Sequence, residues 1–178
     1  MSDSDTHHLP IIGWRERVSL PELNVKSVKA KIDTGARSSA LHALNIEVVE
    51  QAGQSFVRFR VHASQRDRKK IVPVEAKLLE MREVRNSGGK SERRPVIETM
   101  VSVGGQQWPI ELTLTNRGVM GFPMLLGRQA VRRRFLVDSG KSYLQSALPT
   151  RKLKNRKKAK HENSNLVEEL LSIFDTSA

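Results

Sequence analysis

Short segments with alternating apolar and polar side chains, separated by turn residues, fill the chain from Ile11 to Leu148. The segment KSVKAKID, which ends at Asp33, alternates between apolar and polar or charged residues, and SFVRFRVH, which ends at His62, does the same. Side chains two residues apart in a strand lie on one face of a sheet, so each segment predicts a strand with one buried face. The pattern therefore predicts an all-β domain.

Two hairpins are expected in the second half of this domain. The first joins strands from Val96 to Val103 and from Trp108 to Thr115 through a Gly104-Gly105 turn. The second, within MREVRNSGGKSERRPVI, is long and has Asn86-Ser87-Gly88-Gly89 at its apex. A short helix is predicted only for GRQAVRRRF, from Gly127 to Phe135, and FLVDSGKSYL is typical of a closing strand.

The ends of the chain differ in composition from this domain. We expect a flexible N-terminus over residues 1–10, a folded domain over 11–148, and a basic tail over 149–178 that ends in a short amphipathic helix. The formal net charge is +12, and seven Lys or Arg lie between Arg151 and Lys160. Such a surface favours acidic partners, including nucleic acid bound by the tail. No apolar run is long enough for a membrane span, so we expect a cytoplasmic protein without membrane contact.

The chemistry open to the chain is narrowed by the absence of cysteine. Disulfides, thiolate zinc sites and a cysteine nucleophile are excluded. The five histidines show no metal-ligand spacing, and SGGKS lacks the spacing of a phosphate-binding G-x-x-x-x-G-K-[ST] loop. We therefore expect no metal and no cofactor.

The segment Asp33-Thr34-Gly35-Ala36 follows a predicted strand and has two interpretations. In the simpler one the strand ends in a turn, and the carboxylate caps backbone N–H groups. In the other, Asp33 is catalytic: aspartic peptidases need a carboxylate on a rigid strand end, a hydroxyl that links two loops, and a glycine that leaves room for a second copy. Leu126, Gly127 and Arg128 of PMLLGRQ supply the apolar-apolar-Gly support that such a loop needs, and the Gly88-Gly89 hairpin is placed to act as a flap over substrate.

This order of motifs resembles the retropepsins. The segments GWRE, KAKIDTGARSSALHA and RRPVI are similar to the bacterial retropepsin-like family often labelled ATP-dependent zinc protease, the RimB-like family found beside glutamate-ligase genes. The resemblance implies a closed retropepsin-like barrel with a flap. It also implies that the enzyme removes glutamate tails that a ligase adds to a protein, a ribosomal protein being one candidate.

The chain holds one complete motif of this kind, and one carboxylate cannot act as both acid and base on the same water. We therefore expect a C2 homodimer that pairs two copies of Asp33. Viral retropepsins usually carry an acid where Arg37 stands, which pairs with the arginine that matches Arg128. Here either Arg128 finds another acid or Arg37 faces substrate. The residues expected to bind an acidic or poly-glutamylated substrate are Lys31, Arg37, Ser38, Arg85, Ser87, Gly88, Gly89, Arg93 and Arg94.

Other motifs in the chain have simpler interpretations. Asp138-Ser139-Gly140 repeats the motif, but only 38 residues follow it, too few for a second lobe, so Asp138 is expected to end a strand. Ser38 and Ser39 are expected to be hydrogen-bonding neighbours of the Asp33 turn, not nucleophiles. His42, Trp14 and Trp108 are expected to be core residues. A basic RNA- or ribosome-binding module without catalysis stays the alternative function.

Overall fold

The computed structural model describes residues 9–63, 70–85, 89, 91–116 and 121–146. The chain divides into two compact units, Met1–Ser146 and Ala147–Ala178. The second unit lies outside the described residues, as do most of the predicted flexible N-terminus and the predicted tail with its amphipathic helix.

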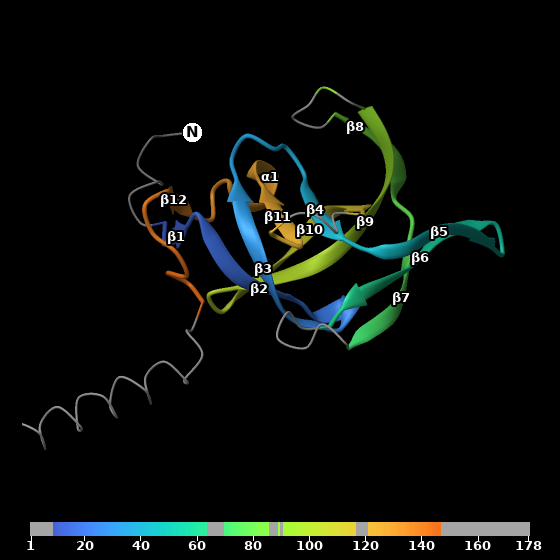
Figure 1. The fold of residues 1–178 in the computed structure, drawn as a ribbon, viewed down its shortest axis with the longest axis horizontal. Helices are drawn as coiled ribbons and strands as arrows, with labels where there is room; N and C mark the ends of the chain where they lie inside the picture. Colours follow the sequence, from blue (N-terminus) through green and yellow to red (C-terminus); the bar gives the residue numbers. More distant parts are fainter. Residues whose placement is uncertain (1–8, 64–69, 86–88, 90, 117–120, 147–178) are drawn as a thin grey trace, which may run out of the picture. The chain divides into compact units, whose positions relative to one another are not determined.

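Six strands close into a barrel, which confirms the predicted all-β fold (Figure 1). Their order is β10-β4-β11-β3-β2-β9, and β9 pairs with β10 to complete the circle. The strands are β2 (Arg15–Leu20), β3 (Val25–Asp33), β4 (Ser39–His42), β9 (Ser91–Val103), β10 (Gln106–Thr115) and β11 (Met124–Gly127). Because a closed barrel has no free edges, each of these strands is fixed on both sides.

Further elements attach to the barrel. Strand β8 (Glu80–Arg85) extends β9 beyond the closure, while β5 (Leu44–Gln51), β6 (Gln54–His62) and β7 (Ile71–Lys77) form a separate three-stranded sheet. Strands β1 (Ile11–Gly13) and β12 (Leu136–Asp138) form a parallel pair. The helical elements are a 3-10 turn, η2 (Pro21–Leu23), and α1 (Arg128–Val131).

The predicted alternation of apolar and polar residues matches the pattern of buried residues that form the core. In β3, Val28, Ala30 and Ile32 are buried, whereas Lys31 between them is exposed. In β6 the same pattern buries Val57, Phe59 and Val61. Trp108 is a core residue with 3% exposure, as expected, but the expectation for Trp14 was wrong. Trp14 is half-buried; the guanidinium of Arg15 lies 4.5 Å from its ring centroid, and the ring of Phe122 meets it edge-on at 5.7 Å.

Both predicted hairpins are present. Gly104 and Gly105 have φ angles of 58° and 80°, and two successive positive φ values are what a two-residue turn between twisted strands requires. The other hairpin joins β8 to β9, which pair in register from Glu80 to Arg85. Its apex residues Ser87 and Gly88 lie outside the described residues.

The predicted helix is shorter than expected. Helix α1 ends at Val131, whereas the sequence pattern extended it to Phe135. Arg132 is extended with ψ of 138° and Arg133 is left-handed with φ of 61°, so the regular helix ends there, although the N–H of Phe135 still donates to the carbonyl of Val131 at 3.1 Å. This sharp turn brings Phe135 into the core, where its ring lies 5.8 Å from that of Trp108.

Candidate active site

Asp33 is the last residue of β3, and it begins a tight turn. Its Oδ1 accepts hydrogen bonds from the backbone N–H groups of Gly35 (3.2 Å) and Ala36 (3.1 Å). The carboxylate therefore caps the turn, as the simpler interpretation required. No hydrogen bond to Oδ2 joins Asp33 to another described residue, so this oxygen can face water or a substrate. The half-buried side chain thus has one oxygen that fixes its orientation and one that makes no hydrogen bond to another described residue.

The loop after Asp33 is held from below by β11 and α1. Strand β11 runs parallel to β3 and places Gly127 beside Asp33. The backbone N–H groups of Arg128 and Gln129 then donate to the carbonyls of Ala36 (2.8 Å) and Arg37 (3.1 Å). As the resemblance implied, the apolar-apolar-Gly segment packs under the loop and leads into a short helix.

Arg128 also supports the loop, though not in the expected way. Its Nη1 donates to the carbonyl oxygen of Thr34 at 3.1 Å. This replaces the acidic partner that sequence reasoning sought, since a carbonyl oxygen also accepts from a guanidinium. Arg37 is exposed. Ser39 is a hydrogen-bonding neighbour as expected, because its Oγ accepts from the N–H of Gly127 at 3.2 Å.

Thr34 and Gly35 are both exposed at the tip of the loop. Between described residues, no hydrogen bond involves the Thr34 hydroxyl. A Cβ built on Gly35 would meet only Asp33 Oδ1 within 4 Å, at 3.4 Å. The loop therefore presents a flat glycine surface and a hydroxyl that is unbonded among the described residues.

The predicted cationic residues lie on β3, on this loop and on the β8–β9 hairpin, and they differ in exposure. Lys31 is exposed on the face of β3 that carries Asp33, as predicted from the strand alternation. Arg85 and Arg93 are exposed on the β8–β9 hairpin, and Gly89 near its apex has φ of 79°. The hairpin and the loop after β3 rise at the same end of the barrel (Figure 1).

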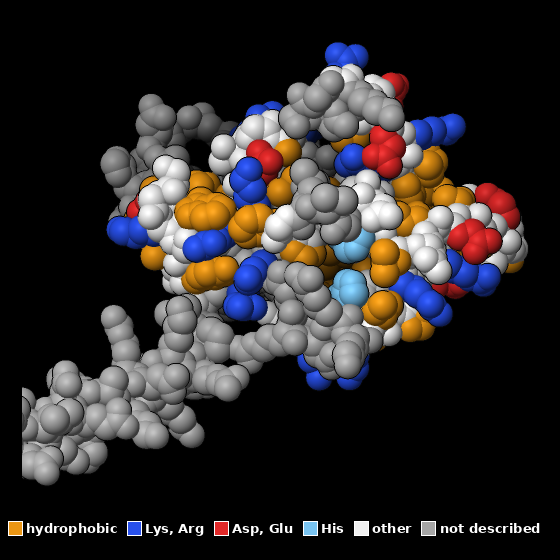
Figure 2. Space-filling view, in the orientation of Figure 1, with side chains coloured by type: hydrophobic (Ala, Val, Ile, Leu, Met, Phe, Trp, Pro, Cys, Tyr) orange, Lys and Arg blue, Asp and Glu red, His pale blue; other side chains and the backbone are white. Residues whose placement is uncertain are grey.

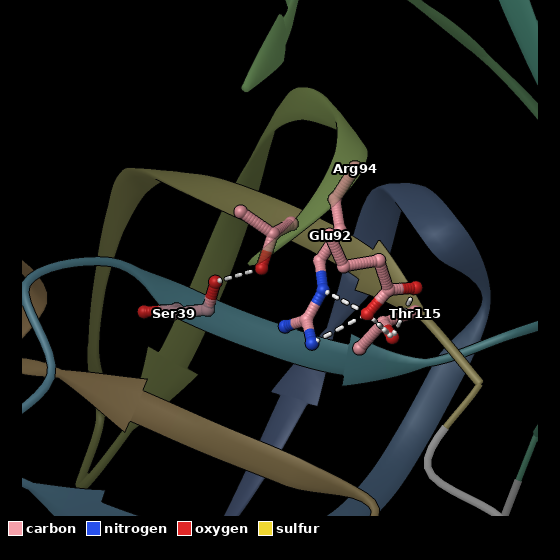
Figure 3. A network of polar contacts seen from close by, with 5 residues as sticks. Ser39, Glu92, Arg94 and Thr115 are labelled. Atoms are coloured by element: carbon pink, nitrogen blue, oxygen red, sulfur yellow. Dashed lines mark hydrogen bonds and ion pairs between the residues drawn. The ribbon is translucent and has the colours of Figure 1, made fainter. Parts of the chain in front are cut away.

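Arg94 differs from the other predicted substrate-binding arginines. Its side chain is only 12% exposed, and its Nη2 and Nε lie 2.7 and 2.8 Å from Glu92 Oε2 (Figure 3). Thr115 of β10 also lies within 3.5 Å of both Glu92 oxygens. The pair therefore links β9, close to the apex of the hairpin, to β10 of the barrel, and the charge of Arg94 is already balanced. Sequence reasoning missed Glu92, although an acid and a base two residues apart on one strand face could have indicated the pair.

His42 and His62 lie next to each other on one face of the molecule, where Figure 2 shows the histidine side chains of the described residues. Their rings stack with centroids 6.2 Å apart. His42 is half-buried at the end of β4, so it packs at the rim of the barrel instead of in the core. Within the described ranges, no group of three or more His, Asp or Glu could hold a metal ion. The same residues include no helix long and apolar enough to span a bilayer.

The second motif, Asp138-Ser139-Gly140, forms a similar turn in a different setting. Asp138 ends β12, as expected, and its Oδ1 accepts from the N–H of Gly140 at 2.9 Å. This hydrogen bond lowers the pKa of Asp138 below its ordinary value, and Lys141, 3.3 Å away, adds to the effect. Asp138 is thus an ion-paired capping residue.

Comparison with known proteins agrees with the geometry. A family model described as retropepsin-like aspartic endopeptidase RimB matches residues 11–147. A crystal structure of a Legionella pneumophila protein of unknown function superposes with a TM-score of 0.64 and 30% identity, covering 77% of this chain and 98% of that one.

Two curated relatives are named probable α-L-glutamate ligases. The one from Shewanella pealeana is 44% identical over 133 residues, which is 75% of this chain, and the one from Desulfotalea psychrophila is 43% identical over 138 residues, or 78% of it. The chain spans 29% of the length of these relatives. Since the family model covers most of the chain and the strand order places its Asp-Thr-Gly loop on a closed barrel, the chain belongs to the RimB-like family of retropepsin-like aspartic endopeptidases.

Proposed function

We propose that this protein is an aspartic peptidase that acts as a C2 homodimer, with Asp33 of each copy as the catalytic carboxylate, on proteins that carry glutamate-rich or poly-glutamate tails. The observation that carries the proposal is the Asp33 loop. It is fixed at the end of a barrel strand by Gly127 and Arg128, and it leaves Asp33 Oδ2 and the Thr34 hydroxyl unbonded within the described residues.

The homodimer follows from the chemistry. Two carboxylates that approach each other share one proton, because like charges raise one of the two pKa values. The ionised carboxylate takes a proton from water, which attacks the scissile carbonyl carbon, while the protonated carboxyl donates to the carbonyl oxygen. The C–N bond then breaks as the amine leaves with a proton, and the products are a carboxylic acid and an amine.

The charges around the loop support an acidic substrate. Lys31 and Arg37 are exposed on either side of the Asp33 turn, and Arg85 and Arg93 are exposed on the hairpin. Arg94 is the exception, since Glu92 balances it. The curated relatives are named for ligation of glutamate, and a peptidase-like region within such a polypeptide is consistent with a glutamate-containing substrate.

The test compares wild-type protein with Asp33→Asn on a protein that ends in a glutamate tail, with products identified by mass spectrometry. Asp138→Asn is the matched control because it alters the other Asp-Ser/Thr-Gly turn. We expect Asp33→Asn to abolish cleavage and Asp138→Asn to retain it. Equal cleavage by wild type and Asp33→Asn would refute the proposal. Salt-sensitive RNA binding that ignores Asp33, without any cleavage, would instead support the basic binding module.

The homodimer has a separate test. Light scattering and activity are measured over the same range of protein concentration. Specific activity should rise with the dimer fraction, because each active site needs both copies. An active monomer at all concentrations would rule the homodimer out.

A further inference from the structure

Four cations face one another on the outer surface of β2 and β3. The strands are antiparallel, and their register places Arg15 opposite Lys31 and Arg17 opposite Lys29. Like charges directly opposite in a sheet destabilise it. Two such rows lie side by side here, and we call these four residues the cationic track. Figure 2 shows Lys and Arg side chains among hydrophobic ones over β1, β2 and β3.

The two arginines of the track are held in place by aromatic rings. The Arg15 guanidinium lies 4.5 Å from the ring centroid of Trp14 and 5.3 Å from that of Tyr143, and its Nε donates to Ser142 Oγ at 3.0 Å. Arg17 lies 5.8 Å from the Tyr143 centroid. These contacts orient the guanidinium groups without neutralising them, so the two arginines keep their positive charge.

Glu16, the acid between the two arginines in sequence, does not neutralise them either. It lies between Arg15 and Arg17 but is fully buried, and it accepts hydrogen bonds from the N–H groups of Leu144 and Gln145. Within the described part of the chain, none of the ion pairs involves Arg15, Arg17 or Lys31. Among the described residues, no ion pair of these three side chains relieves the repulsion between them. A bound anion would relieve it.

The track leads directly to the proposed catalytic residue. Lys29, Lys31 and Asp33 follow one another on one face of β3, with successive rows about 7 Å apart. An extended peptide repeats its side chains on one face at the same interval. A row of glutamates placed along β3 would therefore meet one pair of cations every second residue.

We propose that the cationic track is an exosite that binds the glutamate tail of the substrate beyond the residues at the Asp33 cleft. This inference rests on the proposed function, which it deepens by naming where a long tail is held. From Asp33 the chain must continue for about four residues to reach Arg17 and Lys29. Nucleic acid fits less well, because guanidinium groups already cover a face of Trp14 and of Tyr143 that a base would need for stacking.

The test measures binding in the Asp33→Asn background, so that cleavage does not interfere. Fluorescence anisotropy follows a labelled octa-glutamate peptide at low salt, with or without Arg17→Gln and Lys29→Gln together. The control changes two exposed cations of the three-stranded sheet, Arg60→Gln and Lys77→Gln, which remove the same charge. We expect about tenfold weaker binding for the track variant and less than about twofold for the control. Thermal unfolding verifies that both variants are folded.

The outcomes separate this inference from the proposed function. Equal loss of affinity in both double variants would overturn the exosite, as would tighter binding of an oligouridylate than of octa-glutamate. In the cleaving enzyme, the track variant should raise KM for a long tail more than it lowers kcat. If wild type binds octa-glutamate through the track but cleaves no tail, the peptidase proposal fails while the binding site stands.

Discussion

The carbonyl oxygen of Ser38 occupies the space where a side chain on Gly127 would begin. A Cβ on Gly127 would lie 2.4 Å from that oxygen and 3.0 Å from the carbonyl oxygen of Arg37. Both neighbours are backbone atoms of the loop that carries Asp33, so they cannot move aside as a flexible side chain could. This close backbone contact fixes the distance between the Asp33 loop and β11.

Gly127→Ala should therefore impair the protein in two ways. It should lower the free energy of unfolding by about 1–3 kcal/mol, because the loop must shift. It should also lower kcat by more than stability alone explains, since a shift of about 1 Å in a catalytic group costs up to about 100-fold. Gly121→Ala is the control, because a Cβ there meets no atom within 4 Å. Equal activity of the two variants at a temperature where both are folded would contradict this prediction.

Glu16 should be essential for stability. Its fully buried Oε1 accepts from the N–H groups of Gly13, Leu144 and Gln145, and Oε2 accepts from the Ser146 hydroxyl. Glu16→Ala would leave three buried or partly buried N–H groups without their acceptor. We expect the free energy of unfolding, measured by urea denaturation, to fall by about 3 kcal/mol or more. The control Glu47→Ala on exposed β5 should stay within about 0.5 kcal/mol, and a similar value for Glu16→Ala would disprove the role.

The lowered pKa of Asp138 predicts that the stability of the protein depends on pH. The Gly140 N–H and Lys141 lower its pKa in the folded protein, so the group contributes stability at pH values above about 4, where an unfolded aspartate is ionised. That contribution is lost as the pH falls through the lower folded value. In thermal unfolding, wild type should have a higher Tm than Asp138→Asn at neutral pH, and the difference should shrink below about pH 4. A Tm difference that is constant down to about pH 2 would exclude this linkage.

The Asp33 loop could be predicted from sequence because each of its parts is marked by a short local sequence pattern. Asp33 follows an alternating strand, and the apolar-apolar-Gly segment at Gly127 has a distinctive pattern. The hairpins could also be predicted from sequence, since glycine pairs such as Gly104-Gly105 supply the positive φ values that tight turns need.

Contacts between distant segments could not be predicted in this way. No local pattern indicates that Arg128 donates to the Thr34 carbonyl, or that Glu16 is buried under a segment 128 residues away. After the end of α1 at Val131, Phe135 packs against Trp108, which is also a contact between distant segments. Helical spacing alone therefore overestimated the length of the helix.

Lys31 should decide whether the protein prefers acidic substrates. It is exposed two residues before Asp33 on the same face of β3, where its ammonium group can attract a glutamate beside the scissile bond. Lys31→Glu replaces this attraction by repulsion, so kcat/KM for a glutamate tail should fall by about tenfold or more, while kcat/KM for a neutral peptide should change far less. About 0.5 M salt should have the same selective effect by screening the charge. Lys26→Glu, at the other end of β3, is the matched control because it reverses the same charge on an exposed position of the same strand. If wild type prefers apolar peptides and Lys31→Ala leaves kcat/KM for acidic ones unchanged, the acidic-substrate proposal is wrong.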